Sequence, residues 1–231
     1  MTVSALTSGG DDTYAFSYAT ASISPASGSR GLLYIESSPD NTDPTAPTSI
    51  SGAYATWTLK ASKLDHPSNT KYWVYEGTGS VSSSPVTISF GTTGDERFGC
   101  NWIVLQATDV ADPAYVQSVF AIGTGTTASG TLAAFASGSN GAIIFGNVAD
   151  NGETVTPGTG WTSLVQNGAT AYGAELLYAA WRADNDTSPD FTWGASLDWV
   201  LYAEELSAGG GGPTYLGPPA LIANIIRNRG A

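Results

Sequence analysis

The chain has 231 residues and a net charge of −12, and only 12% of its residues are charged, about half the usual share. This acidic balance excludes direct binding of DNA or RNA, which requires a basic surface. No run of about 18 apolar residues occurs, so the sequence predicts no membrane-spanning helix. Residues Met1 to Ser4 have neither the basic residues nor the apolar run of a secretory signal, so we expect the protein to be made in a cytoplasm.

Apolar and alternating stretches predict about twelve strands, separated by turns at the spacing of an antiparallel β-sandwich or jelly roll, and no helix of ordinary length in residues 1–206. In chain order they are Tyr14–Thr20, Gly31–Glu36, Tyr54–Lys60, Thr70–Glu76, Pro85–Gly91, Gly99–Val110, Tyr115–Ile122, Leu132–Phe135, Ala142–Phe145, Trp161–Gln166, Ala174–Arg182 and Asp198–Leu206. Three prolines predict a long loop over residues 38–52, and Asp112-Pro113 predicts a turn.

The stretch Gly99–Val110 predicts the strand around which the fold is organised. Trp102 and Val104 point to one side of an extended chain, and Ile103 and Leu105 to the other. Because both sides are apolar, we expect this strand to lie between two layers. Asp198–Leu206 has the same pattern, so we predict that Trp102 and Trp199 are both core residues.

The composition changes after residue 208, which predicts a body, 1–208, a flexible linker, Gly209–Gly212, and a C-terminal segment, 213–231. The segment contains no acid and two arginines, so the body alone carries −14. Helical spacing predicts an apolar stripe on a short helix, and we expect the segment to anchor the protein to a partner. The predicted partner-binding residues are Tyr215, Leu216, Leu221, Ile222, Ile225, Ile226, Arg227 and Arg229.

Residues that could carry chemistry are few. Cys100 lies in an apolar strand and is expected to be buried and inert, and His66 precedes Pro67 in a predicted turn without a nucleophile motif. Five glutamates are candidates for a pair of catalytic carboxylates, but no spacing singles out a pair, and positions at strand ends suit a solvated role. These are Glu36, Glu76, Glu175, Glu204 and Glu205. We therefore expect no catalytic residues and no enzymatic activity.

Two further features of the sequence are compatible with ligand binding. The loop residues Asp184, Asn185 and Asp186 offer oxygen atoms to calcium, although they do not match the helix–loop–helix pattern, and acidic turns also form for local reasons. The expectation is therefore no cofactor and no metal, with calcium as the alternative. Most aromatic residues fall inside strands, but Trp161 follows a Gly- and Pro-rich turn and also fits an exposed rim that binds sugar.

Several segments resemble a group of β-sandwich proteins found in the particles of tailed bacteriophages. They are Leu32-Leu33, Trp102–Pro113, Leu132–Ser137, Thr156–Trp161, Trp181–Pro189 and Asp198-Trp199, and together they extend over residues 30–206. The resemblance implies a lectin-like jelly roll and a structural role in the virion, and it does not distinguish the head from the tail. Our leading interpretation is capsid decoration, with the major capsid protein or further copies of the chain as partners. The first alternative is a tail-associated or surface module that binds host carbohydrate, and the second is a glycan-active enzyme.

Overall fold

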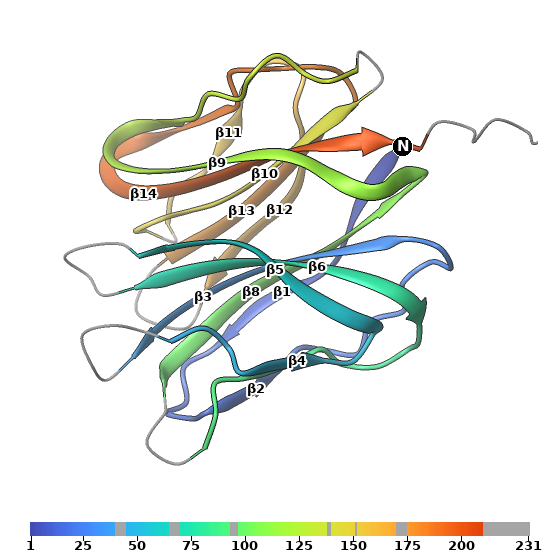
Figure 1. The fold of residues 1–231 in the computed structure, drawn as a ribbon. Helices are drawn as coiled ribbons and strands as arrows, with labels where there is room; N and C mark the ends of the chain where they lie inside the picture. The colour runs from blue at the N-terminus through green and yellow to red at the C-terminus, as the bar shows by residue number, and fades with distance from the viewer. Residues whose placement is uncertain are drawn as a thin grey trace, which may run out of the picture.

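The computed structural model describes residues 1–39, 45–64, 70–92, 97–137, 140–150, 152–169 and 175–209, and within them every regular element is a β-strand. Three antiparallel sheets form, which we call A, B and D (Figure 1). Sheet A has the order β1 (Thr2–Asp11), β8 (Arg97–Thr108), β3 (Arg30–Pro39), β6 (Lys71–Val81) and β5 (Tyr54–Leu64). Sheet B has the order β2 (Ser17–Ala19), β7 (Thr87–Ser89) and β4 (Ser49–Ser51).

Sheet D contains the remaining strands of the described residues. Its order is β11 (Thr156–Pro157), β14 (Asp190–Ala208), β10 (Gly141–Val148), β13 (Glu175–Arg182) and β12 (Thr162–Ala169), and the long strand β9 (Val110–Ser129) also pairs with β14. The first half of the chain therefore builds sheets A and B, and the second half builds sheet D. A jelly roll passes back and forth between its two sheets. The antiparallel β-sandwich is confirmed, whereas the jelly-roll connectivity is not.

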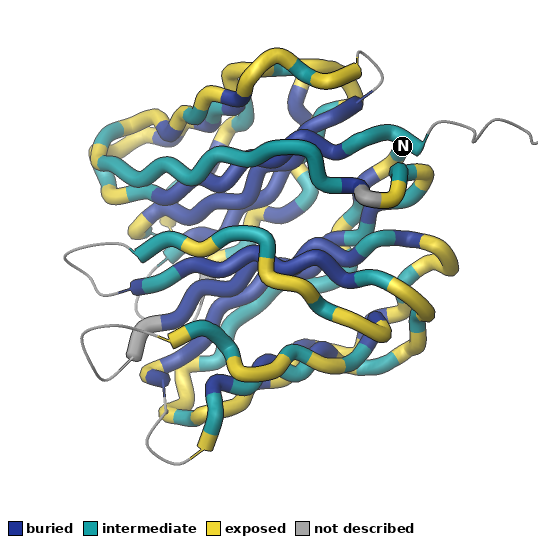
Figure 2. The backbone as a smooth tube through the Cα atoms, in the orientation of Figure 1, coloured by how far each residue is buried: buried dark blue, intermediate teal, exposed yellow. Residues whose placement is uncertain are grey.

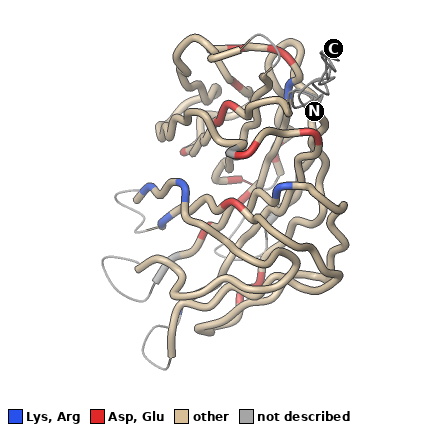
Figure 3. The backbone as a smooth tube through the Cα atoms, turned by 45° about the vertical axis from the view of Figure 1, so that its right-hand side comes forward, with Lys and Arg blue, Asp and Glu red and all other residues tan. Residues whose placement is uncertain are grey.

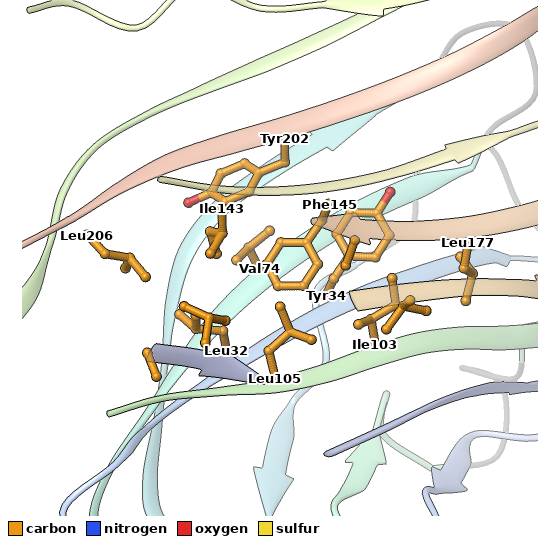
Figure 4. Close-up of a cluster of buried hydrophobic side chains, with 14 of the residues drawn as sticks. Leu32, Tyr34, Val74, Ile103, Leu105, Ile143, Phe145, Leu177, Tyr202 and Leu206 are labelled. Carbon is orange, nitrogen blue, oxygen red and sulfur yellow. The ribbon is translucent and has the colours of Figure 1, made fainter. Parts of the chain in front are cut away.

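The central core lies between sheets A and D (Figure 4). Sheet A contributes alternate residues of its inner strands, and sheet D contributes a matching set. The labelled members are Leu32, Tyr34, Val74, Ile103 and Leu105 from sheet A, and Ile143, Phe145, Leu177, Tyr202 and Leu206 from sheet D. The rings of Tyr34 and Phe145 stack with their centroids 5.6 Å apart, so aromatic packing joins the two sheets directly.

Strand β8 is buried on both faces, which confirms the prediction for this stretch. Ile103 and Leu105 face sheet D, while Trp102 and Val104 belong to a second core between sheets A and B. A third core lies on the outer face of sheet D, where Leu132, outside the strands, belongs to the same buried cluster as Phe191 and Trp193 of β14. Figure 2 shows the resulting pattern, with buried strands in the middle of both large sheets.

The two predicted core tryptophans differ. Trp102 is 6% exposed and lies over Gly9, where an added Cβ would stand 3.5 Å from the ring. Trp199 is only partly buried and packs at the edge of the outer core of sheet D, against Gly123. The prediction of a core position is therefore confirmed for Trp102, while Trp199 covers the margin of a core.

Three local predictions are wrong for identifiable reasons. Residues Thr2–Asp11 form edge strand β1, although their small and polar side chains give no strand signal. Leu132–Phe135 form no strand, because this apolar run serves as a cover over sheet D. The chain reverses not at Asp112-Pro113, which lies inside β9, but at Asp109, whose φ is 55°.

Candidate functional site

Four of the five glutamates predicted to lie on a solvated surface are buried, and Glu175 is partly buried. Glu36, Glu204 and Glu205 are 1% exposed or less, and Glu76 is 5% exposed. Figure 3 shows acidic positions along the strands as well as on the loops. A position at the end of a strand does not leave these side chains solvated, because the opposite sheet or a loop covers those ends. Each buried carboxylate needs partners, and these partners define three polar clusters.

The first cluster joins Glu36 of β3 to Glu175 of β13 across the gap between sheets A and D. The amide nitrogen of Asn147 lies 3.0 Å from Glu36 Oε1 and 3.4 Å from Glu175 Oε2, so one side chain contacts both acids. Asn101 Nδ2 donates to the other oxygen of Glu36 at 3.2 Å. Both acids are candidates in the sequence, but no spacing pairs them, because they are far apart in the chain and meet only when the sheets stack.

The electrostatics of this pair favour a proton between the two acids. Burial raises the pKa of Glu36 well above its ordinary value, and the nearby charge and hydrogen bond of Glu175 raise this pKa further. The amides of Asn101 and the hydroxyl of Tyr72 act in the opposite direction, because they stabilise the carboxylate. Glu36 therefore stays protonated at pH values where an exposed glutamate is ionised, and it donates this proton towards Glu175.

The space beside this pair is small. A cavity of about 80 Å³ is lined by Tyr72, Asn147, Glu175 and Asp198, together with Ala149, Trp199 and Val200. This volume suits a few water molecules, whereas ligand sites in proteins usually enclose roughly 300–1,000 Å³. In glycosidases the two carboxylates flank the substrate and stand about 5–10 Å apart. Glu36 and Glu175 instead contact each other, so their geometry is that of an internal proton-sharing pair.

The second cluster lies farther along the same interface. Lys60 Nζ of β5 forms an ion pair of 2.5 Å with Glu76 of β6 and lies 5.2 Å from the ring centre of Tyr115. Across the gap, Glu204 of β14 accepts a hydrogen bond from the Tyr202 hydroxyl. Burial raises the pKa of Glu204 to about 7, helped by the charge of Glu76, while Tyr202 and Lys60 partly offset this rise.

The third cluster fixes a loop to sheet D. The Glu205 carboxylate accepts hydrogen bonds from Gln117 Nε2 at 2.6 Å, from the backbone nitrogen of Ala136 at 2.9 Å and from Asn140 Nδ2 at 2.6 Å. Asn140 in turn accepts a bond from the backbone nitrogen of Ala208. Glu205 therefore holds the covering segment that includes Leu132 against its own strand.

The loop predicted to offer calcium ligands already contains a cation. The guanidinium of Arg182 pairs with Asp184 and lies 3.0 Å from Asp186 Oδ2. The same oxygen of Asp186 accepts a hydrogen bond of 3.0 Å from Trp161 Nε1. Across the described ranges, no three acidic, histidine or cysteine side chains gather in a metal-binding arrangement. Calcium binding by Asp184, Asn185 and Asp186 stays a prediction, and such an ion would have to displace Arg182.

The structure tests the predictions for Trp161 and Cys100, whereas His66 and the predicted partner-binding residues lie outside its described part. Trp161 is 7% exposed, so the exposed rim that its position in the sequence also fitted is not formed by this residue. Cys100 is buried and free, and burial raises the pKa of its thiol, in line with an inert residue. His66 and the partner-binding residues of the C-terminal segment lie outside the described part of the chain. They are Tyr215, Leu216, Leu221, Ile222, Ile225, Ile226, Arg227 and Arg229.

One group of exposed aromatic side chains was not predicted from the sequence. Tyr14, Phe16 and Phe98 are 53%, 41% and 47% exposed, and the rings of Tyr14 and Phe98 lie 5.5 Å apart. In the strand predicted over residues 14–20, Tyr14, Phe16 and Tyr18 alternate with small residues and so share one side, but only Tyr18, at 2% exposed, is buried. The sequence signal for Tyr14 and Phe16 is therefore present, but it does not distinguish a core face from a displayed one.

Comparison with protein-family models, curated proteins and solved structures finds no match to this chain. Among the residues that the structure describes, no helix has the length and apolarity needed to cross a membrane.

Proposed function

We propose that the protein is a structural component of a phage virion, most readily a capsid decoration protein that docks onto other virion subunits. The partner is the major capsid protein or another copy of this chain, and the role is one of binding. The proposal rests on the resemblance of residues 30–206 to β-sandwich proteins of phage particles. Its fold requirement, an antiparallel β-sandwich, agrees with the sheets described above.

One structural observation supports this proposal over an enzymatic role. The acids that could have formed a catalytic pair are used inside the fold, where Glu36 contacts Glu175 and Glu204 accepts a bond from Tyr202. The cavity beside Glu175 measures about 80 Å³, which is smaller than the roughly 300–1,000 Å³ that ligand sites usually enclose. The contact between Glu36 of β3 and Glu175 of β13 joins sheets A and D, as expected of a scaffold.

The arrangement of the layers gives further support. Both large sheets are covered on their two faces, so few apolar side chains are left for solvent. A body with several buried cores is stiff, because close-packed interiors resist deformation. Stiffness suits a protein that is fixed to a particle, and the low share of charged residues suits a surface packed beside neighbours.

The test is to locate the protein on purified particles of the phage that encodes it. Mass spectrometry of the particles should detect the chain, and electron microscopy with an antibody label should place it on the head. A label confined to the tail would replace capsid decoration with the tail-associated alternative. Absence from washed, infectious particles would refute the structural role.

The carbohydrate and enzyme alternatives are tested on the purified protein. A glycan array should give no specific signal, and incubation with bacterial surface polysaccharide should release no reducing ends. Turnover that disappears in Glu175→Gln but persists in Asp12→Asn, an exposed acid, would overturn the non-enzymatic proposal. The Asp12 variant controls for the general loss of one negative charge.

A further inference from the structure

The aromatic patch formed by Tyr14, Phe16 and Phe98 is the largest group of exposed apolar side chains among the described residues. The only other large hydrophobic residue described as exposed is Leu59, at 44%, on edge strand β5. Solvent-exposed phenylalanine is unfavourable, and aromatic residues gathered on a surface mark interaction sites. The patch lies where β8 begins, beside the segment that leads into β2.

The backbone beneath the patch is firmly held. Ala15 and Arg97 exchange two backbone hydrogen bonds of 3.1 and 2.7 Å, and Phe16 accepts a third from Phe90 at 2.8 Å. The hydroxyl of Tyr18 lies within 3.0 Å of the carbonyl oxygens of Thr13, Ala15 and Arg97. A rigid aromatic surface loses little entropy on binding, which is the property of an interface hot spot.

The base of the C-terminal segment is at the opposite end of the body. Gly209 donates a backbone hydrogen bond of 2.7 Å to Asp109, the residue that follows β8. Phe98 stands near the start of the same strand, so about ten residues at roughly 3.3 Å each, on the order of 35 Å, separate patch and base. Figure 1 shows the start of β8 and the end of β14 at opposite ends of the molecule.

We infer that the aromatic patch of one copy receives the C-terminal segment of a second copy, so that the chains associate head to tail. This inference rests on the proposed structural role and names its partner. The sequence places an apolar stripe, Leu221, Ile222, Ile225 and Ile226, about twelve residues beyond Gly209. The roughly twelve residues from Gly209 to the stripe span at most about 40 Å when fully extended. To reach the patch of the same chain, they would need an almost straight path along the whole sandwich.

Charge complements the apolar contact. Asp11 and Asp12 adjoin Tyr14, and Asp11 is oriented by hydrogen bonds from the backbone and side chain of Thr13 at 2.9 and 2.6 Å. The C-terminal segment contributes Arg227 and Arg229 without any acid. Bodies of charge −14 repel one another, so a basic segment between them lowers this repulsion. Because the two contact surfaces differ, the interface is heterologous and leads to rings or open chains.

The test uses the full chain and two variants with complementary defects. The patch variant carries Tyr14→Ser and Phe98→Ser, and the stripe variant carries Ile222→Asp and Ile225→Asp. Sedimentation velocity should show concentration-dependent association of the natural protein, and both variants should associate at least about tenfold more weakly. Leu59→Ser, which removes the exposed side chain outside the patch, should associate like the natural protein.

Mixing supplies the decisive readout. An equimolar mixture of patch and stripe variants should form dimers that grow no further, because one variant keeps an intact segment and the other an intact patch. Equal circular dichroism spectra and melting temperatures will show that each variant is folded. The inference is refuted if the natural chain is monomeric at about 100 µM, if the patch variant associates normally, or if the mixture stays monomeric.

The outcomes separate this inference from the structural role itself. A chain that is monomeric in solution but present on purified particles defeats head-to-tail docking and leaves the virion role intact. A chain that associates head to tail but is absent from particles defeats the virion role and leaves the docking. Glycan binding lost in the patch variant alone, without self-association of the natural chain, would assign the patch to carbohydrate and refute the inference.

Discussion

The buried glutamates determine how this protein responds to pH. Glu204 is enclosed between the sheets, and its pKa is raised from 4.5 to about 7. The folded protein therefore retains a proton that the unfolded chain has already released between pH 4.5 and 7. The folded state binds more protons in this window, so the free energy of unfolding falls as the pH rises through it. Below pH 4.5 both states are protonated and the effect disappears.

We predict that Glu204→Gln removes this part of the pH dependence. Glutamine keeps a polar group beside Tyr202 but carries no charge. The natural protein should lose about 3 kcal/mol of its free energy of unfolding by the time the pH exceeds 7, and this loss should be largely absent in the variant. Urea unfolding at pH 5 and pH 8 measures both values. Asp12→Asn should leave the pH dependence unchanged, and a Glu204→Gln variant that loses as much stability between the two pH values as the natural protein would contradict the argument.

The two tryptophans provide a second prediction at this scale. Trp102→Ala should lower the free energy of unfolding by about 3–5 kcal/mol, because it removes a large buried side chain from the core between sheets A and B. Trp199→Ala should cost less, since its ring is partly solvated and covers the margin of sheet D. Urea unfolding of the two variants compares them, and equal losses would show that Trp199 is a core residue after all.

At the scale of elements, strand prediction succeeded where side-chain alternation reflects burial. Strand β8 is the clearest case, because Ile103 and Trp102 face different cores and both faces are apolar. Prediction failed for β1, where an edge position tolerates small polar residues, and for Leu132, whose apolar run covers a sheet without joining it. Periodicity reports which side is buried but does not report what covers it.

The candidate site was predictable only in part, for a related reason. The sequence identified the right acids, including Glu36, Glu175 and Glu204, but their pairing depends on which sheet stacks on which. Asn101, inside the predicted strand Gly99–Val110, and Asn147, just after the predicted strand Ala142–Phe145, had no assigned role. A polar residue inside an otherwise apolar strand is the feature that could have indicated inter-sheet hydrogen bonds.

The segment over sheet D yields a prediction for an element. Glu205→Ala removes the acceptor for Gln117, Ala136 and Asn140, so buried donors lose their partner. We expect the free energy of unfolding to fall by about 2–4 kcal/mol and amide exchange to increase across residues 131–137. Hydrogen-exchange mass spectrometry measures this. Glu153→Ala, which removes an acceptor of one backbone bond from Gly194, should leave exchange in that segment unchanged.

For the whole molecule, the shared core between sheets A and D predicts a single unfolding transition. Both halves of the chain contribute to that core, so neither half can lose its structure without exposing the other. Limited proteolysis should cut first near residues 209–213 and leave a body that melts at the temperature of the full chain. An early cut within residues 99–200, or two separate transitions in calorimetry, would show that the halves are independent domains.

The division of the sheets along the chain also has a consequence for synthesis on the ribosome. Sheets A and B are complete once β8 has emerged, but sheet D needs β14, the last strand, between β9 and β10. A nascent chain therefore displays the apolar inner face of sheet A throughout the translation of the second half. Chains that stall or are truncated before Asp190 would keep that face uncovered, which makes the half-made protein the species most prone to aggregate.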